Sequence, residues 1–283
     1  MALILILILI LVVVAALVVS LLVWRQRDHQ ADRAEMARLI ALQPADPPCF
    51  SVDMLAGLPE PARRFFTFAI AEGTPLRTVA RIEMTGQFGM GDKAKPNYLR
   101  MQATQVLAAP EGFVWAMSGG SGALRLSGSD SGKWTRFWLL WGLPVARFGG
   151  NGDHRPSAFG RYVAEAVFWT PAAVLPGPNV TWAHVSQDVA RMTMRHAELE
   201  QSVELTLAED GRPLQVSFLR WSDANPEKAY RLQPFGGYLS EFRVFDGFRL
   251  PTHVEAGNMF ETDAYFPFFR ADVTAISFPE PDP

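Results

Sequence analysis

The chain has 283 residues, with 26 lysines and arginines against 29 aspartates and glutamates and a formal net charge of −3. This balance excludes a nucleic-acid binder that works through bulk positive charge, because such domains carry a basic excess on one face. A single cysteine, Cys49, excludes an internal disulfide, a cysteine-rich zinc site and a CxxC redox motif. The length is enough for one large domain or two small ones.

The N-terminal segment 2–23 is apolar and uncharged, and Ser20 is its one polar residue. As a helix it would be about 33 Å long, which matches the ~30 Å hydrocarbon core of a bilayer. A cleaved signal peptide is the alternative, but it needs a basic leading region, a shorter apolar stretch of about 7 to 15 residues and a small-residue cleavage site. We therefore predict a single-pass transmembrane anchor over residues 1–24, with Trp24 at the membrane interface.

Arginines follow the apolar segment, and no basic side chain precedes it. The positive-inside rule therefore favours a cytoplasmic location for the rest of the chain, with the other side of the cell membrane as the alternative. Residues 25–48 are predicted to form a juxtamembrane helix, ending at Pro44, and then a stiff proline-rich linker. The remaining residues, 49–283, are predicted to fold as one domain.

Alternating apolar and polar residues dominate the chain from residue 79 onward, as in 203–207 and 214–218. These two segments flank Asp210 and Gly211, a typical hairpin turn. Repeated antiparallel strands of this kind build a sheet with one apolar and one polar face. Further strands are predicted at 79–88, 98–107, 112–117, 180–185, 188–195, 238–245, 248–256 and 271–278.

Two amphipathic segments, 58–73 and 157–169, are predicted helices that cover the apolar face of this sheet. The predicted fold class is thus α+β: an N-terminal transmembrane helix, then a large curved antiparallel sheet, half-barrel-like, covered by a few helices.

Two stretches interrupt the alternation. Residues 118–133 are dense in glycine and serine, which predicts flexible turns in place of a packed element. Residues 137–146 are ten in a row without a polar side chain, too few to cross a membrane. We interpret them as a core strand and turn, with a lipid-facing loop or a lid over a cavity as the alternative.

Catalytic and cofactor motifs fail on inspection. The segment 119–123 lacks the last glycine of a nucleophile elbow, and the run ending at Lys133 lacks the first glycine and the final serine or threonine of a phosphate loop. The five histidines have no metal-ligand spacing. The sequence therefore predicts no enzyme, no cofactor and no metal.

Arg161, Glu165 and Trp169 lie four residues apart on the second predicted helix. An exposed ion pair at this spacing contributes only about 0.2 to 0.5 kcal/mol, and a surface pair is the simpler interpretation. The alternative is a pair at the mouth of a cavity that orients a ligand. We expect a structural or ligand-orienting role, because an ion pair on one helix lacks a nucleophile, a third orienting group or a metal.

Several segments, among them 58–76, 138–146, 160–176 and the late stretch from 237 to 276, resemble a family of bacterial proteins known only as a domain of unknown function. The resemblance covers roughly Leu58 to Phe278. Members commonly carry N-terminal membrane helices, and the domain is similar to lipoprotein-carrier half-barrels, in which a curved sheet holds a lipid under helical lids.

The positions that best match the family pattern are Arg161, Tyr162, Glu165, Trp169 and Pro171, followed by Trp115, Tyr238 and Pro251. Trp138 and Trp141 depart from it, since family members usually have a less aromatic segment there. No catalytic residue comes with the resemblance. The predicted ligand-lining residues are Trp115, Trp138, Trp141, Arg161, Tyr162, Glu165, Trp169 and Tyr238.

These observations favour a membrane-anchored module that binds a lipid or other apolar molecule without chemistry. The predicted partners are the bilayer, through residues 2–23, and that ligand; the sequence identifies no protein partner. The alternatives are a scaffolding protein of the membrane with a fully packed sheet, and an enzyme whose catalytic groups come from distant strands. An apolar cavity of about 300 to 1,000 Å³ would favour binding, and native packing throughout would favour the scaffold.

Overall fold

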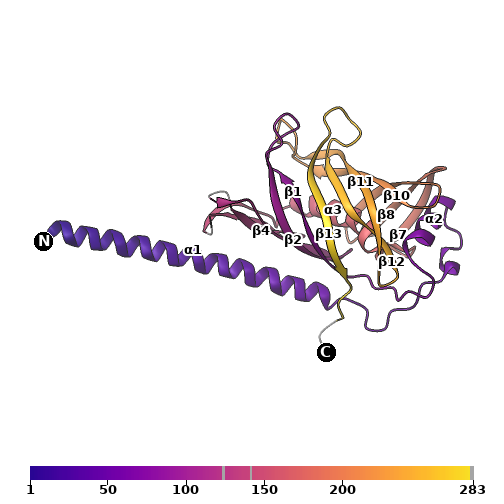
Figure 1. The fold of residues 1–283 in the computed structure, drawn as a ribbon, viewed down its shortest axis with the longest axis horizontal. Helices are drawn as coiled ribbons and strands as arrows, with labels where there is room; N and C mark the ends of the chain where they lie inside the picture. Colours follow the sequence, from indigo (N-terminus) through magenta and orange to yellow (C-terminus); the bar gives the residue numbers. More distant parts are fainter. Residues whose placement is uncertain (123–124, 141, 281–283) are drawn as a thin grey trace.

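The computed structural model describes residues 1–122, 125–140 and 142–280, and in them a long helix leads into one antiparallel sheet of 13 strands (Figure 1). The predicted fold class is confirmed. The helices are α1 (Ala2–Ile40), α2 (Glu60–Ala69) and α3 (His154–Trp169), with 3₁₀ turns η1 (Val52–Leu55) and η3 (Pro171–Val174). The strands are β1 (Ala80–Gly89), β2 (Tyr98–Ala108), β3 (Gly112–Gly119), β4 (Leu126–Ser131), β5 (Thr135–Leu139), β6 (Leu143–Phe148), β7 (Val180–Ser186), β8 (Val189–His196), β9 (Leu199–Leu207), β10 (Pro213–Ser222), β11 (Arg231–Phe245), β12 (Phe248–Asn258) and β13 (Phe266–Ser277).

The sheet consists of two meanders that meet in its middle. Its strand order is β6-β5-β4-β3-β2-β1-β13-β12-β11-β10-β9-β8-β7, so β1 pairs with β13 while β6 and β7 lie at opposite edges. The chain must therefore cross the whole sheet between β6 and β7. It crosses over the inner face as α3, which contacts β9 and β10 most and also reaches β2, β3 and β12.

Side chains alternate between the two faces as the sequence predicts. In β1, Ile82 and Met84 are buried under the helices, whereas Arg81 and Glu83 are exposed on the outer face. The buried side chains of both meanders, of α2 and of α3 form one continuous hydrophobic core on the inner face.

Helix α2 closes one end of this core. Phe65 and Phe66 pack on Trp182 of β7, with ring centroids 5.8 and 5.2 Å apart. The helix ends at Ala69, earlier than the predicted boundary at residue 73, because Ile70 is extended and pairs with Phe248 at the start of β12.

The prediction of flexible turns at 118–133 is wrong for residues 126–131, which form β4. Small residues here permit close packing on both sides. A Cβ atom on Gly128 would lie 2.0 Å from the backbone oxygen of Arg136 in β5. Ser129 is almost fully buried, and its hydroxyl donates to the Asp32 carboxylate of α1 at 2.7 Å. Glycine therefore marks a close approach of β4 to β5 here, and serine marks a tight contact of β4 with α1.

Helix α1 continues without a break from the apolar segment into the predicted juxtamembrane helix. Its last turns lie on the outer face of the sheet, where Leu39 is fully buried against Val106 and Val114. Beyond the helix, the Gln43 side chain accepts hydrogen bonds from the backbone of Thr78 and Val79 at 2.9 and 3.0 Å. Both faces of the sheet are thus covered by helix, the outer face only in part.

An acidic face of α1, formed by Asp28, Asp32 and Glu35, is buried against β4 and β5. Asp28 lies 3.0 Å from Arg136 and 2.6 Å from Arg147, and it also accepts a hydrogen bond from the indole of Trp138 at 2.9 Å. Burial alone would raise the pKa of Asp28, but the hydrogen bonds from Arg147 and Trp138 and the nearby positive charges outweigh it and lower the pKa.

Further along the same face, Asp32 pairs with Arg136 at 2.8 Å and Glu35 pairs with Lys133 at 2.7 Å. The pKa of Glu35 is lowered in the same way, since burial is outweighed by hydrogen bonds from Arg38 and Lys133. These ion pairs fix the position of α1 along the sheet.

Because these carboxyl groups have a lower pKa in the folded than in the unfolded chain, their contribution to stability is complete above their ordinary range near pH 4 and is lost as the pH falls through the folded-state values. We expect Asp28→Asn to remove part of this pH dependence. It leaves Arg147 without its carboxylate and removes one of the two carboxylates that pair with Arg136, which should lower the free energy of unfolding by about 3 to 5 kcal/mol.

Urea unfolding of the full chain in mild detergent at neutral and acidic pH measures both effects. Glu83→Gln is the matched control, because its pair with Arg81 is exposed and 3.7 Å apart and should contribute at most about 1 kcal/mol. Equal losses in the two variants would contradict the docking described here.

Candidate functional site

A cavity of about 220 Å³ lies between α3 and the inner face of the sheet. Its walls come from α3, β1, β3–β5 and β10–β13, so both meanders contribute. The lining residues are Phe88, Trp115, Asp130, Thr135, Phe137, Arg161, Ala164, Glu165, Phe168, Trp169, Val216, Phe218, Arg220, Phe235, Gly236, Val254, Ala256, Phe268 and Phe269.

Nearly half of the residues in this wall are aromatic. Phe88 packs on Trp115 and on Phe268 with ring centroids 5.9 and 5.7 Å apart. Phe235 continues the cluster, 6.0 Å from Phe268 and 5.3 Å from Phe218. Rings at these distances form a rigid apolar surface with a defined shape.

The remainder of the wall carries buried charges. Arg161 of α3 pairs with Glu165 at 2.8 Å and with Asp130 of β4 at 2.6 Å, and each of these side chains is less than one-fifth exposed. Gln105 donates to Glu165 at 2.6 Å, and the hydroxyl of Thr135 donates to Asp130 at 2.6 Å. Burial alone would lower the pKa of Arg161, but the two carboxylates outweigh it and raise the pKa.

Arg220 of β10 faces the same cavity with less compensation. Its Nε atom donates to the backbone oxygen of Ser157 at 3.3 Å, and its guanidinium lies 5.1 Å from the centroid of the Phe235 ring. Burial, followed by the positive charge of Arg161, lowers its pKa to about 10. A negative group entering the cavity would stabilise this cation.

Four of the predicted ligand-lining residues meet at this cavity: Trp115, Arg161, Glu165 and Trp169. The cavity-mouth interpretation of the Arg161–Glu165 pair therefore fits the structure better than a surface pair. Tyr162 is buried behind the cavity wall, where its ring lies 5.7 Å from Phe113 and its hydroxyl donates to Pro110 at 3.1 Å.

Trp138 and Tyr238 do not line the cavity. Trp138 follows the cavity residue Phe137 in β5 and so points to the opposite face, where it is bonded to Asp28. Tyr238 is likewise on the outer side and packs on Phe260 with centroids 5.2 Å apart. Trp141 lies outside the described residues.

The apolar stretch 137–146 forms most of the β5–β6 hairpin, the edge of the sheet next to α1. The strands and the turn agree with the interpretation, but a core position is wrong for Leu140, Leu143 and Val145, which are about half exposed. The hairpin also differs from a lid over the cavity, to whose wall it contributes Thr135 and Phe137. The sequence analysis missed Asp130 and Arg220. Arg220 could have been found, because it follows the inward-facing Val216 and Phe218 at the spacing of two that a strand requires.

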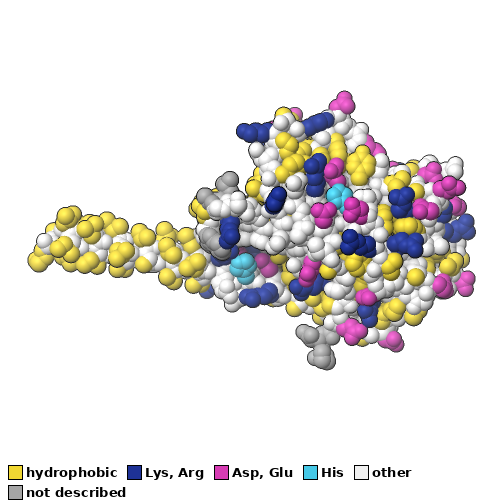
Figure 2. Space-filling model, viewed as in Figure 1, with side chains coloured by type: hydrophobic (Ala, Val, Ile, Leu, Met, Phe, Trp, Pro, Cys, Tyr) yellow, Lys and Arg dark blue, Asp and Glu magenta, His cyan; other side chains and the backbone are white. Residues whose placement is uncertain are grey.

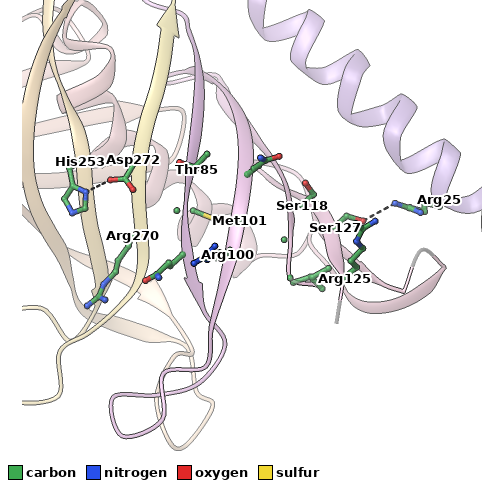
Figure 3. Close-up of a pocket in the computed structure, with 16 residues that line it drawn as sticks. Arg25, Thr85, Arg100, Met101, Ser118, Arg125, Ser127, His253, Arg270 and Asp272 are labelled. Carbon is green, nitrogen blue, oxygen red and sulfur yellow. Dashed lines mark hydrogen bonds and ion pairs between the residues drawn. The ribbon is translucent and has the colours of Figure 1, made fainter. Parts of the chain in front are cut away.

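A second hollow lies on the outer face, as a groove of about 950 Å³ across β1–β4, β12 and β13 (Figure 3). It is polar and predominantly basic. Its charged side chains are Arg25, Arg100, Arg125, Arg270 and the pair His253–Asp272, whose atoms are 2.7 Å apart. Gly86, Gly119 and Gly120 leave backbone exposed in its floor. Among the described residues, no group of three or more histidine, cysteine, aspartate or glutamate side chains could hold a metal ion.

Residues 48–271 match the model of a family of unknown function, DUF6544. The chain belongs to this family. The resemblance that the sequence segments indicate is thereby confirmed.

Solved structures with a similar fold include a LolA superfamily protein from Nitrosomonas europaea, with 9% sequence identity and a TM-score of 0.39 over 78% of this chain and 92% of that one. Another is a DUF1329 family protein from Desulfovibrio piger, with 10% identity and a TM-score of 0.39 over 77% and 90% of the two chains. No curated protein matches the chain.

The buried ion pairs of Arg161 lead to a prediction about the free energy of unfolding. Arg161→Met leaves Asp130 and Glu165 uncompensated, so it should lower the free energy of unfolding by about 3 to 5 kcal/mol. Adding Glu165→Gln to Arg161→Met removes one of the two stranded charges, and the double variant should be more stable than Arg161→Met alone.

Urea unfolding of Arg161→Met, Glu165→Gln and the double variant measures this coupling. The exposed pair Arg191–Glu204 is the control, and the same comparison there should give changes of at most about 1 kcal/mol. If the changes at Arg161 and Glu165 are additive and each lowers the free energy of unfolding by less than about 1 kcal/mol, the pair is solvated, which would contradict the buried network.

Proposed function

We propose that this chain is a membrane-anchored binding module that holds a lipid or other apolar molecule in the cavity beneath α3. The proposal requires no chemistry on the ligand. It combines an N-terminal anchor with a sheet domain whose inner face keeps space between its own side chains.

The anchor is supported by the length and composition of α1. Its most apolar 18-residue window has a mean hydropathy of 3.7, and none of that window is buried within the protein. Figure 2 shows hydrophobic side chains along the whole free part of the helix, in contrast to the mixed charges of the sheet domain. Trp24 follows this segment at the position where interfacial aromatics lie, and the arginines beyond it favour the cytoplasmic side.

The observation that carries the proposal is the aromatic cavity itself. Protein interiors are close-packed, with few voids larger than a water molecule, so 220 Å³ of space with an aromatic-rich lining argues against a fully packed scaffold. The volume is below the ~300 to 1,000 Å³ of common ligand pockets. It accommodates a short apolar group, and a complete acyl chain would require α3 to move away from the sheet.

The charged wall indicates what the ligand carries at its polar end. Arg161 is neutralised by two carboxylates, whereas Arg220 has a lowered pKa and no ion pair among the described residues. Charge-assisted hydrogen bonds from a guanidinium to a carboxylate or phosphate are strong and directional. We therefore propose an amphipathic ligand with an anionic head group on Arg220 and an apolar part against Phe235 and Phe268.

Filling the cavity tests this proposal. Ala164 lies in the cavity wall on α3 and is buried, so Ala164→Leu should reduce the amount of bound lipid several-fold by occupying its space. The measurement is native mass spectrometry of the full chain released from detergent micelles, in which retained lipid appears as a mass increment. Arg220→Met should shift the retained species away from anionic lipids.

Ala183→Leu is the control, because Ala183 is exposed in β7, away from the cavity. Wild-type chain without retained lipid, or equal retention in Ala164→Leu and Ala183→Leu, would contradict binding in this cavity.

A further inference from the structure

We propose that the tip of the β5–β6 hairpin enters the bilayer beside α1 and forms a second membrane contact. The inference rests on the proposed anchor, and it concerns the surface formed by Leu140, Leu143 and Val145, here called the hairpin tip. Its partner is the acyl-chain region of a lipid bilayer.

The hairpin tip is an exposed apolar surface. Leu140, Leu143 and Val145 are 47%, 55% and 50% exposed and lie within six residues of one another. The exposed large apolar side chains elsewhere in the described sheet domain are mostly scattered singly, as is ordinary for a soluble surface. The three side chains of the hairpin tip, by contrast, are clustered at a turn. They resemble the apolar elements by which proteins enter a membrane interface.

The ion pairs with α1 fix where this tip lies. Going along α1 toward its N-terminus, the contacts come in the order Glu35, Asp32 and Asp28. Their partners on the sheet follow one another toward the hairpin tip, as Lys133, Arg136 and Trp138. Strand β5 therefore runs alongside α1 toward the apolar segment, and its next residues lie beyond Trp138 in that direction. Figure 1 shows β4, the neighbour of β5, in this position beside α1.

Trp24 marks the level of the membrane interface and is part of the same contact. Its ring lies 5.5 Å from that of Trp138, and the guanidinium of Arg147 lies 4.3 Å from its centroid. Strand β5 and strand β6 therefore both reach the level of Trp24, the residue that follows the apolar segment.

The basic residues next to the hairpin tip are also consistent with its insertion into the bilayer. The backbone N–H of Leu140 donates to the backbone oxygen of Arg125 at 3.0 Å, and Arg125 is one of the residues that line the basic groove (Figure 3). Arg25 lines the groove there as well. Arginines immediately outside an apolar element lie at the level of anionic lipid head groups.

This arrangement has a consequence for ligand entry. The strand that leads to the hairpin tip contributes Phe137 to the cavity wall and Trp138 to the contact with α1. The cavity and the bilayer therefore share one structural element, and a lipid leaving the membrane would meet the cavity wall next to the anchor.

Site-directed spin labelling tests the membrane contact in the full chain. Because the chain has a single cysteine, Cys49→Ser removes the native labelling site, and Leu143→Cys then carries the nitroxide alone. Leu143 is exposed, so the label should not disturb the fold. The chain is placed in nanodiscs of phosphatidylcholine and phosphatidylglycerol. The accessibility of the label to oxygen, which partitions into lipid, is compared with that to a water-soluble nickel chelate.

We expect the oxygen-to-nickel ratio at Leu143→Cys to be several-fold higher than at Leu219→Cys, an equally exposed apolar position on β10. Leu17→Cys within the span tests the anchor separately. A label at 143 as accessible to nickel as that at 219, with the label at 17 in lipid, would overturn the inference and leave the anchor standing. Nickel access at 17 would overturn both.

Discussion

The fold depends on one topological constraint: the two edges of the sheet are consecutive in the chain but lie at its opposite ends. The connection from β6 to β7 has to cross a whole face of the sheet, and it crosses the apolar one as α3. The crossing supplies the cover that this face needs in water. A helix over a curved sheet touches it most closely along part of its length, here β9 and β10, and the aromatic cavity lies in the space that remains.

The outer face shows how α1 and the sheet are joined. The helix that carries the apolar segment also presents Asp28, Asp32, Glu35 and Leu39 to the sheet, so its direction and rotation are set by matched side chains. Buried ion pairs are weak evidence for added stability, because desolvation offsets much of their attraction. Their value here is positional, since each carboxylate of α1 meets a particular basic side chain of the sheet: Glu35 meets Lys133, Asp32 meets Arg136 and Asp28 meets Arg147.

Sequence periodicity was sufficient to predict the elements that have one solvent-exposed face and one buried face. The strands after residue 79 and the amphipathic helices follow from it directly. It failed at β4, because α1 covers the outer face of that strand and small polar residues replaced the expected alternation. It also missed the buried acidic face of α1, although 28, 32, 35 and 39 share a helical face, because charge was taken to indicate solvent.

The cavity could be predicted only in part. Trp115 was predicted from the family pattern, and Arg161, Glu165 and Trp169 from that pattern and their helical spacing, and all four line it. Trp138 was predicted from the apolar stretch 137–146, but the alternation within β5 sends Phe137 inward instead. No local pattern brings Asp130 from β4 and Arg220 from β10 to one point, because that meeting depends on the order of strands across the sheet.

The central claim is that a lipid occupies the space beneath α3, and photo-crosslinking in the membrane tests it most directly. The full chain is held in nanodiscs that contain an anionic phospholipid with a diazirine in its acyl chain, and the cross-linked peptides are mapped by mass spectrometry. The account predicts adducts on cavity residues such as Phe168, Phe235 and Phe268, in addition to those on α1. Adducts confined to α1 and the β5–β6 hairpin would mean that lipid touches only the outside of the protein, and would contradict the claim.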